Sequence, residues 1–177
     1  MWISQDFDRL KGPIVDILES ASPVNDFVAL DIDATVLHPR ELVPEPTGMF
    51  VRDVAVANNI PVVFITAREE SEDGRDATMA HLADIGITNP LLVILKPSHV
   101  QTWEGISRYK AGARAYIEKK TNSRCVMNVG DQWTDLMPLT NSTWRGLNRT
   151  FRDQYLLFAQ PRNDEVERWS VKLKEYP

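Results

Sequence analysis

Cysteine is nearly absent from this sequence. Cys125 is the only one among 177 residues, so the chain can form no intramolecular disulfide and no zinc site of the paired-cysteine type. The residues around it, "RCVMNV", are apolar, which indicates a small buried side chain rather than a reactive thiol. A disulfide framework and a zinc site of the paired-cysteine type are therefore excluded.

The sequence also lacks long apolar runs and blocks of basic charge. No stretch approaches the roughly 18 apolar residues that a membrane helix needs. The first residues, "MWISQDFDRLKGPIVDIL", carry acidic side chains early and no unbroken apolar segment, so they do not resemble a signal peptide. A net charge of −5 without a basic block gives no support to a nucleic-acid-binding patch. We therefore expect a cytoplasmic protein without a membrane partner.

What the sequence does contain is an alternation of apolar runs with amphipathic helical patterns. Apolar residues make up 43% and charged residues 25% of the chain, an ordinary balance for one globular domain over 1–177. Strand-like apolar runs separated by helices predict right-handed crossovers and a central parallel sheet, the α/β architecture of a Rossmann-like three-layer sandwich. The expected strands are 27–32, 61–66, 91–95, 124–129 and 155–159, and the expected helices are 5–20, 47–59, 71–86, 107–120 and 163–175, with a core over 26–160.

Carboxylates and hydroxyls stand where these strands end. "FVALDIDATVL" ends its apolar run with Asp31 and Asp33, which point to the same face because side chains alternate along a strand. "PVVFITAR" ends in Thr66, and "VMNVGDQWTDL" supplies Asp131 and Asp135. Ligands of such sheets bind at the carboxyl ends of the strands, so we expect these side chains to lie close together.

A cluster of four carboxylates needs a partner, because like charges in a cleft repel each other. A divalent cation relieves this repulsion, and oxygen donors from aspartate suit Mg²⁺. Magnesium bound by few carboxylates keeps positions for water and for a substrate phosphate. The pattern therefore predicts a phosphoryl-transfer site in which a carboxylate can act as the nucleophile.

Four motifs carry a family resemblance. "DIDAT", "FITAR", the lysine of "YKAGAR" and "NVGDQWTDL" resemble the four motifs of the haloacid dehalogenase (HAD) superfamily of phosphatases. Within it, "FITAR", "YK" followed by Arg114, and "GDQWTDL" look most like the plant-type and bacterial class B and C acid phosphatases of subfamily III. "RDATMAHLADIG" resembles the helix that follows the second motif in that group. The similarity extends over 27–136.

The resemblance implies a role for each motif residue. Asp31 would attack phosphorus and form an aspartyl-phosphate, and Asp33 would protonate the leaving alkoxide and then deprotonate the hydrolytic water. Thr66 and Ala67 would hold the phosphate, and Lys110 would neutralise charge on Asp31 and the phosphate. The implied Mg²⁺ ligands are Asp31, the backbone carbonyl of Asp33, and Asp131, with Asp135 as a further ligand or a support for one. Arg68 and Arg114 are candidates for the substrate side.

Two lysines compete for the third motif. Lys110 belongs to "SRYKAGAR", where a cap at Ser107 would place it in the first turn of a helix. Lys96 follows an apolar run directly in "LLVILKP". The sheet order of the superfamily, with 27–32 between 61–66 and 124–129, would leave Lys96 too far out to reach Asp31. We therefore expect Lys110 to serve the site.

The spacing of the motifs leaves no room for a cap domain. About 30 residues separate Thr35 from Thr66, and the core needs them for a loop, a helix and a strand. The segment between Thr66 and Lys110 accommodates one helix and one strand. An open site would accept varied or bulky phosphomonoesters, with the Pro-rich loop at 36–46 as a semi-rigid flap. Nucleoside monophosphates are expected from the resemblance alone.

Other interpretations remain open at this level. The aspartates could begin a turn, and Trp133 could pack in the core or stack on a substrate base. The chain as a whole could instead be a phospho-accepting signalling domain, a phosphotransferase with an acceptor other than water, or an inactive relative with a storage or binding role.

Overall fold

The computed structural model describes residues 1–162 and 165–177, and the seven strands among them form one sheet in the order β1-β6-β7-β5-β2-β3-β4. Five of these strands run parallel, whereas β6 is antiparallel to β7 and β1 is antiparallel to β6. The strands are β1 (Trp2–Ser4), β2 (Asp26–Leu30), β3 (Val62–Glu69), β4 (Val93–Lys96), β5 (Arg124–Gly130), β6 (Tyr155–Arg162) and β7 (Glu165–Lys172). The helices are α1 (Asp8–Glu19), α2 (Pro46–Ala57), α3 (Glu72–Asp84), α4 (Trp103–Thr121) and α5 (Asn141–Phe151), with a short 3₁₀ turn, η1 (Trp133–Asp135).

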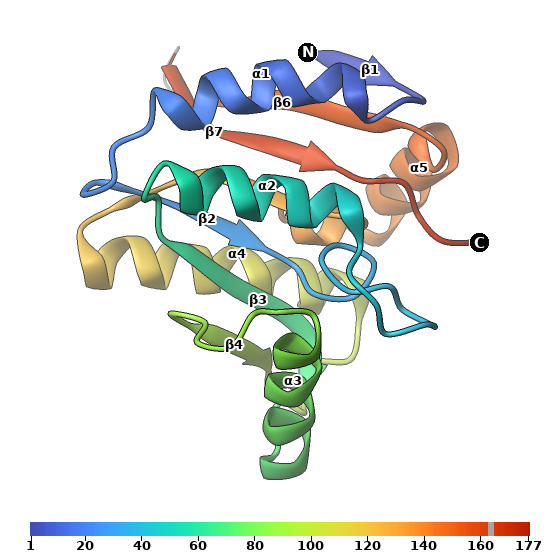
Figure 1. Cartoon of the computed structure of the whole chain (residues 1–177). Helices are drawn as coiled ribbons and strands as arrows, with labels where there is room; N and C mark the ends of the chain where they lie inside the picture. The colour runs from blue at the N-terminus through green and yellow to red at the C-terminus, as the bar shows by residue number, and fades with distance from the viewer. Residues whose placement is uncertain (163–164) are drawn as a thin grey trace.

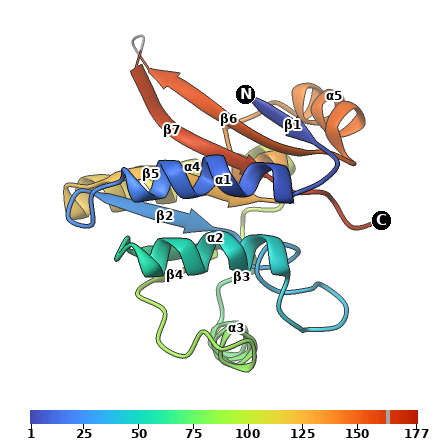
Figure 2. The ribbon, with the colours of Figure 1, turned by 45° about the horizontal axis from the view of Figure 1, so that its top comes forward.

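Helices cover both faces of the sheet, as Figures 1 and 2 show. Helices α1 and α2 lie side by side over one face, and α4 lies behind the other. Strand β2 is buried along its whole length because it runs through the middle of the sheet. The α/β architecture with a mostly parallel, Rossmann-like sheet is thus confirmed, and so is the position of β2 between β3 and β5.

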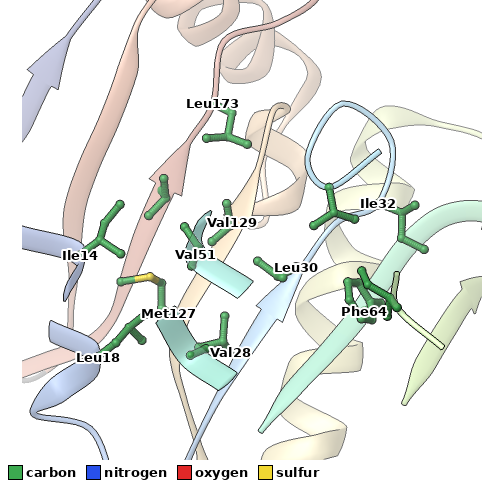
Figure 3. Close-up of a cluster of buried hydrophobic side chains, with 14 of the residues drawn as sticks. Ile14, Leu18, Val28, Leu30, Ile32, Val51, Phe64, Met127, Val129 and Leu173 are labelled. Carbon is green, nitrogen blue, oxygen red and sulfur yellow. The ribbon is translucent and has the colours of Figure 1, made fainter. Parts of the chain in front are cut away.

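Alternating side chains of the central strands build two apolar cores. Val28 and Leu30 of β2 point toward α1 and α2, where they meet Ile14, Leu18 and Val51 (Figure 3). The intervening side chains pack with α4 on the opposite face; they are Phe27, Ala29, Val63, Ile65 and Cys125. Cys125 is buried, as its apolar surroundings predict. These two cores fix β2, and with it the loop that leaves its carboxyl end.

The predicted C-terminal helix over 163–175 is wrong. Residues 163–164 lie outside the described residues, and the segment that follows them is the strand β7, which pairs with both β5 and β6. Apolar side chains repeat every second residue along β7 and just beyond its end: Val171 and Leu173 belong to the first core, and Trp169 packs against it. The many charged residues within 163–175 suggested a polar amphipathic helix, but pairing with two strands outweighs helix propensity.

Two further elements have no counterpart in the sequence prediction. Helix α5 begins after Thr140, whose Oγ1 accepts a hydrogen bond from the Thr143 amide, and β1 pairs with β6 at the edge of the sheet. Other predicted boundaries are close to the observed ones. Ser71 caps α3, and Gly86 follows that helix with a φ of +89°, a conformation that favours glycine.

Candidate active site

A pocket of about 400 Å³ opens at the carboxyl ends of β2, β3 and β5. It is the place at which parallel α/β sheets bind their ligands. Most predicted site residues line it, together with side chains from α4 and from the C-terminal segment. The lining residues are Asp31, Asp33, Ala34, Pro39, Thr66, Ala67, Arg68, Trp103, Ile106, Lys110, Asp131, Gln132, Thr134, Asp135 and Tyr176.

Asp31 directly follows β2 and lies at the bottom of this pocket. Its amide donates to the Val129 carbonyl of β5, so the backbone is still held by the sheet at this position. Its side chain is 9% exposed, and the Nζ atom of Lys110 lies 2.7 Å from its Oδ1. Burial, and then the nearby Asp135 charge, raises the pKa of Asp31 to about 7, while Lys110 opposes the shift. Asp31 thus lines the pocket as a buried carboxylate with a lysine beside it.

Three buried carboxylates, Asp31, Asp131 and Asp135, each offer an oxygen within 4.8 Å of the others. Burial raises the pKa of Asp131 well above its usual range, and the charges of Asp135 and Asp31 add to this effect. Lys110 bonds to two of these acids, and the buried Lys172 acts on Asp131 and Asp135 without a bond to either. Three carboxylates still outnumber the two lysines, and the donors of the group are all oxygen atoms. This donor set fits a hard divalent cation.

The close packing of the fourth motif requires glycine at position 130. The Asp135 carboxylate folds back over Gly130 and accepts a hydrogen bond from the Gln132 amide at 3.0 Å. A Cβ atom at position 130 would lie 2.2 Å from the Asp135 Oδ2 atom. Glycine therefore leaves room for the side chain of Asp135, so that Asp131 and Asp135 can lie in one site.

Lys110 neutralises part of this cluster. It is 2% exposed and donates to Asp31 at 2.7 Å and to Asp135 at 2.5 Å. Although burial works against its charge, Asp135 and Asp31 raise the pKa of Lys110 above its usual value. The lysine therefore stays charged between the two acids.

The expected cap at Ser107 is wrong. Helix α4 begins at Trp103, and Thr102 caps it by accepting from the Gly105 amide at 3.0 Å. Ser107 is buried inside the helix and donates to the Glu104 carbonyl. Lys110 consequently lies beyond the first turn. The other lysine, Lys96, donates to the Val100 carbonyl and is not among the pocket-lining residues of the described chain.

A bulge in β3 turns Thr66, Ala67 and Arg68 toward the pocket. The pairing with β4 is regular up to Ile65 and resumes at Glu69, so the residues between are released from the ladder. The Tyr109 hydroxyl lies 2.9 Å from the carbonyl oxygens of both Thr66 and Ile94. Bulges of this kind often aim side chains at functional sites. Here the bulge places the Thr66 hydroxyl among the lining groups.

Asp33 lies apart from the buried acids. Its side chain is 43% exposed, and Arg68 binds both of its oxygens at 2.8 Å. The loop that carries it turns tightly, because the Ile32 carbonyl accepts from the amides of Thr35, Val36 and Leu37. Asp33 therefore faces the opening of the pocket, whereas Asp31 lies at its bottom.

Arg114 is not brought to the pocket. The residue is 3% exposed, and its guanidinium donates to the carbonyl oxygens of Asp135 and Leu136. Asn128 donates to the same Leu136 carbonyl at 3.0 Å. The expected substrate contact of Arg114 does not fit this placement, because the side chain supports the turn after Asp131 from beneath.

Aromatic side chains at the site differ from those that the sequence suggested. Trp133 is 4% exposed and packs against Phe151 and Phe158, so it belongs to the core. Trp103 lines the pocket instead, is 44% exposed, and stacks on Trp144 of α5 with 4.7 Å between ring centroids. No sequence signal identified Trp103, because its partner lies on a helix that the sequence prediction missed.

The C-terminal segment completes the rim. Tyr176 lines the pocket, its hydroxyl bonds to the Glu45 carboxylate, and its ring packs edge-on against His38 at 4.6 Å. Within the loop at 36–46, the His38 amide donates to the Val43 carbonyl. The Pro-rich loop is thus held at its base and from the C-terminal side.

Comparisons with known proteins agree with this geometry. The sequence profile described as HAD superfamily, subfamily IIIB (acid phosphatase), matches residues 47–162. A comparison with curated protein sequences gave no significant match. None of the helices that the structure describes has the length and apolar character needed to cross a membrane. The matched segment includes Thr66, Lys110, Asp131 and Asp135, while Asp31 and Asp33 precede it. By this match over more than half of its length, the chain belongs to subfamily IIIB of the HAD superfamily, the acid phosphatases, which hydrolyse phosphomonoesters.

Proposed function

We propose that the protein hydrolyses phosphomonoesters with Mg²⁺ and through a phosphoryl group carried by Asp31. The observation that carries this proposal is the position of Asp31. It lies at the bottom of the pocket, 2.7 Å from a buried lysine and within 4.8 Å of two further buried acids. A carboxylate in such a setting can attack a phosphoryl group whose charge is met by nearby cations.

The reaction has two displacements at phosphorus. A carboxylate oxygen of Asp31 forms a bond to phosphorus as the bond to the leaving oxygen breaks, and Asp33 gives that oxygen its proton. Water then attacks the phosphoryl group on Asp31, Asp33 takes a proton from the water, and inorganic phosphate leaves with Asp31 restored. Thr66 and the backbone at Ala67 hold phosphate oxygens in both steps, and Lys110 offsets the charge that develops.

The metal would be held by Asp31, Asp131 and the backbone carbonyl of Asp33, with Asp135 as a ligand or as support. When bound, Mg²⁺ supplies positive charge to the transferred phosphoryl group and fixes its orientation. Lys110 lies between the carboxylates of Asp31 and Asp135 and reduces the repulsion between them. The excess of buried carboxylates over the lysine that contacts them supports a bound cation.

We also propose that the site works without a cap domain. In the described chain, the segment from Thr35 to Thr66 builds α2 and β3, and that from Thr66 to Lys110 builds α3 and β4. Strands β3 and β4 belong to the sheet, and α2 and α3 contact it. The rim is formed instead by the loop at 36–46, by Tyr176 and by Trp103. Such a pocket favours substrates with a large leaving group.

Trp103 favours a flat leaving group such as a nucleoside. Its ring is held by the stack on Trp144, so little conformational freedom would be lost on binding. Replacing Trp103 with alanine is expected to lower kcat/KM for a nucleoside monophosphate about tenfold, in line with the loss of one stacking contact. For glycerol phosphate, kcat/KM should change by less than about twofold, because glycerol has no ring that could stack on Trp103.

The matched control for this test is Tyr116→Ala. Tyr116 is an exposed aromatic residue on the same helix, and it lines a different groove of the described surface. Tyr116→Ala should therefore leave kcat/KM unchanged for both substrates. Equal losses for the two substrates in Trp103→Ala would contradict the stacking role.

Removing Lys110 tests the charge balance of the site. We expect Lys110→Ala to lower kcat at least about 100-fold and Lys96→Ala to lower it less than about tenfold, since only the first removes an electrostatic stabiliser of the phosphoryl group. The two lysines make a matched pair, because both are buried and both donate hydrogen bonds. Steady-state rates on variants that melt cooperatively give the comparison. The reverse ranking would show that Lys110 does not serve the reaction.

A further inference from the structure

Arg68 connects Asp33 to helix α3. Its Nε and Nη2 atoms donate to the two oxygens of Asp33 at 2.8 Å each. Its Nη1 atom reaches the other way, 3.3 Å from the Thr78 hydroxyl and 3.0 Å from the His81 Nδ1 atom. Thr78 and His81 stand three residues apart on α3 and therefore share one face of the helix. The guanidinium thus lies between a half-exposed loop carboxylate and a packed helix.

The contact between Arg68 and His81 allows one hydrogen-bond direction. A guanidinium group has only donors, so in this contact the Nδ1 atom of His81 is the acceptor, which corresponds to the tautomer with its proton on Nε2. Thr78 donates its own proton to the Gly74 carbonyl at 2.7 Å, which leaves its oxygen as an acceptor for Arg68. Both contacts of Nη1 therefore restrain the plane of the guanidinium group, and that plane sets the plane of the bound carboxylate.

We propose that His81 is a positioning residue that fixes the Asp33 carboxylate through Arg68. The inference rests on the proposed function, in which Asp33 moves the protons of both steps. Asp33 is carried by a loop and its side chain is 43% exposed, so its rotamer needs support from its neighbours. The two hydrogen bonds from Arg68 to Asp33 supply this support, and they keep their geometry only while the Nη1 atom is bonded to side chains of α3. His81 thereby acts on the reaction without touching the substrate.

The leaving group decides how much this positioning matters. An alkoxide is a poor leaving group and needs the proton of Asp33 as its bond to phosphorus breaks. A nitrophenolate leaves without that proton, although the later attack by water still uses Asp33 as a base. A displaced Asp33 should therefore slow the cleavage of the ester bond in an alkyl phosphate. With a nitrophenyl phosphate it should slow only the later attack by water.

The test compares His81→Leu with His81→Asn. Asparagine can place its Oδ1 atom near the position of Nδ1 and accept from Arg68, whereas leucine fills the space without an acceptor. With glycerol phosphate, His81→Leu should lower kcat about tenfold through misplacement of Asp33, and His81→Asn should stay within about threefold of the parent protein. KM should change little in either variant.

Rapid mixing with 4-nitrophenyl phosphate supplies the readout that a purely structural role would not move. In His81→Leu the first turnover should release nitrophenolate at the parent rate, followed by a slowed steady state. Thr78→Val removes the second contact of Nη1 without changing the shape of the side chain. It should likewise slow the steady state and leave the first turnover unchanged. His99→Leu, in an exposed loop position, serves as the control and should match the parent protein.

Several results would overturn the inference. Activity of His81→Leu equal to that of the parent, equal impairment of the asparagine and leucine variants, or a first turnover slowed as much as the steady state would each do so. The proposed function has its own test in the Asp31→Asn variant, assayed alongside. An inactive Asp31→Asn together with an unimpaired His81→Leu would reject the role of His81 alone.

Discussion

Asp31→Asn is expected to leave the protein folded and to reduce phosphomonoester hydrolysis below about one percent of the parent rate, because the amide is a far weaker nucleophile. Asparagine keeps the shape of the side chain at the bottom of the pocket. It also keeps an oxygen that can accept from Lys110, which donates to Asp31 at 2.7 Å. The loss of activity should therefore come from chemistry and not from unfolding.

Asp26→Asn provides the matched control. Asp26 is also a buried aspartate, but it is the first residue of β2, at the opposite end of the strand from Asp31, and it accepts from the Ser22 amide. This variant should keep its activity even if its melting temperature falls. Residual turnover above about one percent in Asp31→Asn, in protein free of other phosphatases, would count against covalent catalysis.

Metal removal is the second change with a very large expected effect. Chelation should abolish activity and Mg²⁺ should restore it, because Asp31, Asp131 and Asp135 are buried within 4.8 Å of one another and Lys110 balances only part of their charge. Calcium should not restore the rate, since its larger and looser coordination does not fix the octahedral geometry that an in-line displacement uses.

A binding titration separates the metal site from catalysis. Calorimetry with Mg²⁺ alone should show binding to the parent protein and a large loss of affinity in Asp131→Asn. A control variant, Asp53→Asn on the exposed side of α2, should bind like the parent. Full activity in excess chelator would reject the assignment of magnesium.

The central part of the fold could be predicted from the sequence for a clear reason. Strands β2, β3 and β5 are covered on both faces, so their residues form nearly unbroken apolar runs between amphipathic helices. Strand β7 carries the opposite pattern. Its inward residues, such as Trp169 and Val171, alternate with charged or polar ones, and such a short mixed segment does not distinguish a strand from a polar helix.

The candidate site also combines features that the sequence predicts with features that it does not. The rule that ligands bind at strand ends was enough to expect Asp31, Thr66, Asp131 and Asp135 together, and the structure brings them to one pocket. The third motif was assigned to Lys110 by resemblance, but the reason given for its helix position failed because Thr102, and not Ser107, caps α4. Both are plausible caps in the sequence.

Contacts between distant segments could not be predicted at all. Trp103 gains its place from a stack on Trp144, and Tyr176 reaches the pocket from the C-terminal segment. The bond between Arg68 and His81 joins a strand bulge to the helix that follows it. No periodic pattern marks such pairs, because each depends on the tertiary arrangement of both partners.

Locating the phosphoryl group tests the account most directly. The protein is mixed with a phosphomonoester and Mg²⁺, quenched in acid within the first turnovers, and digested for peptide mass spectrometry. We expect an acid-stable, hydroxylamine-sensitive phosphoryl group on Asp31, which is absent from the Asp31→Asn variant. A phosphoryl group on another residue, or product release with no phosphorylated protein under conditions in which the second step limits the rate, would contradict it.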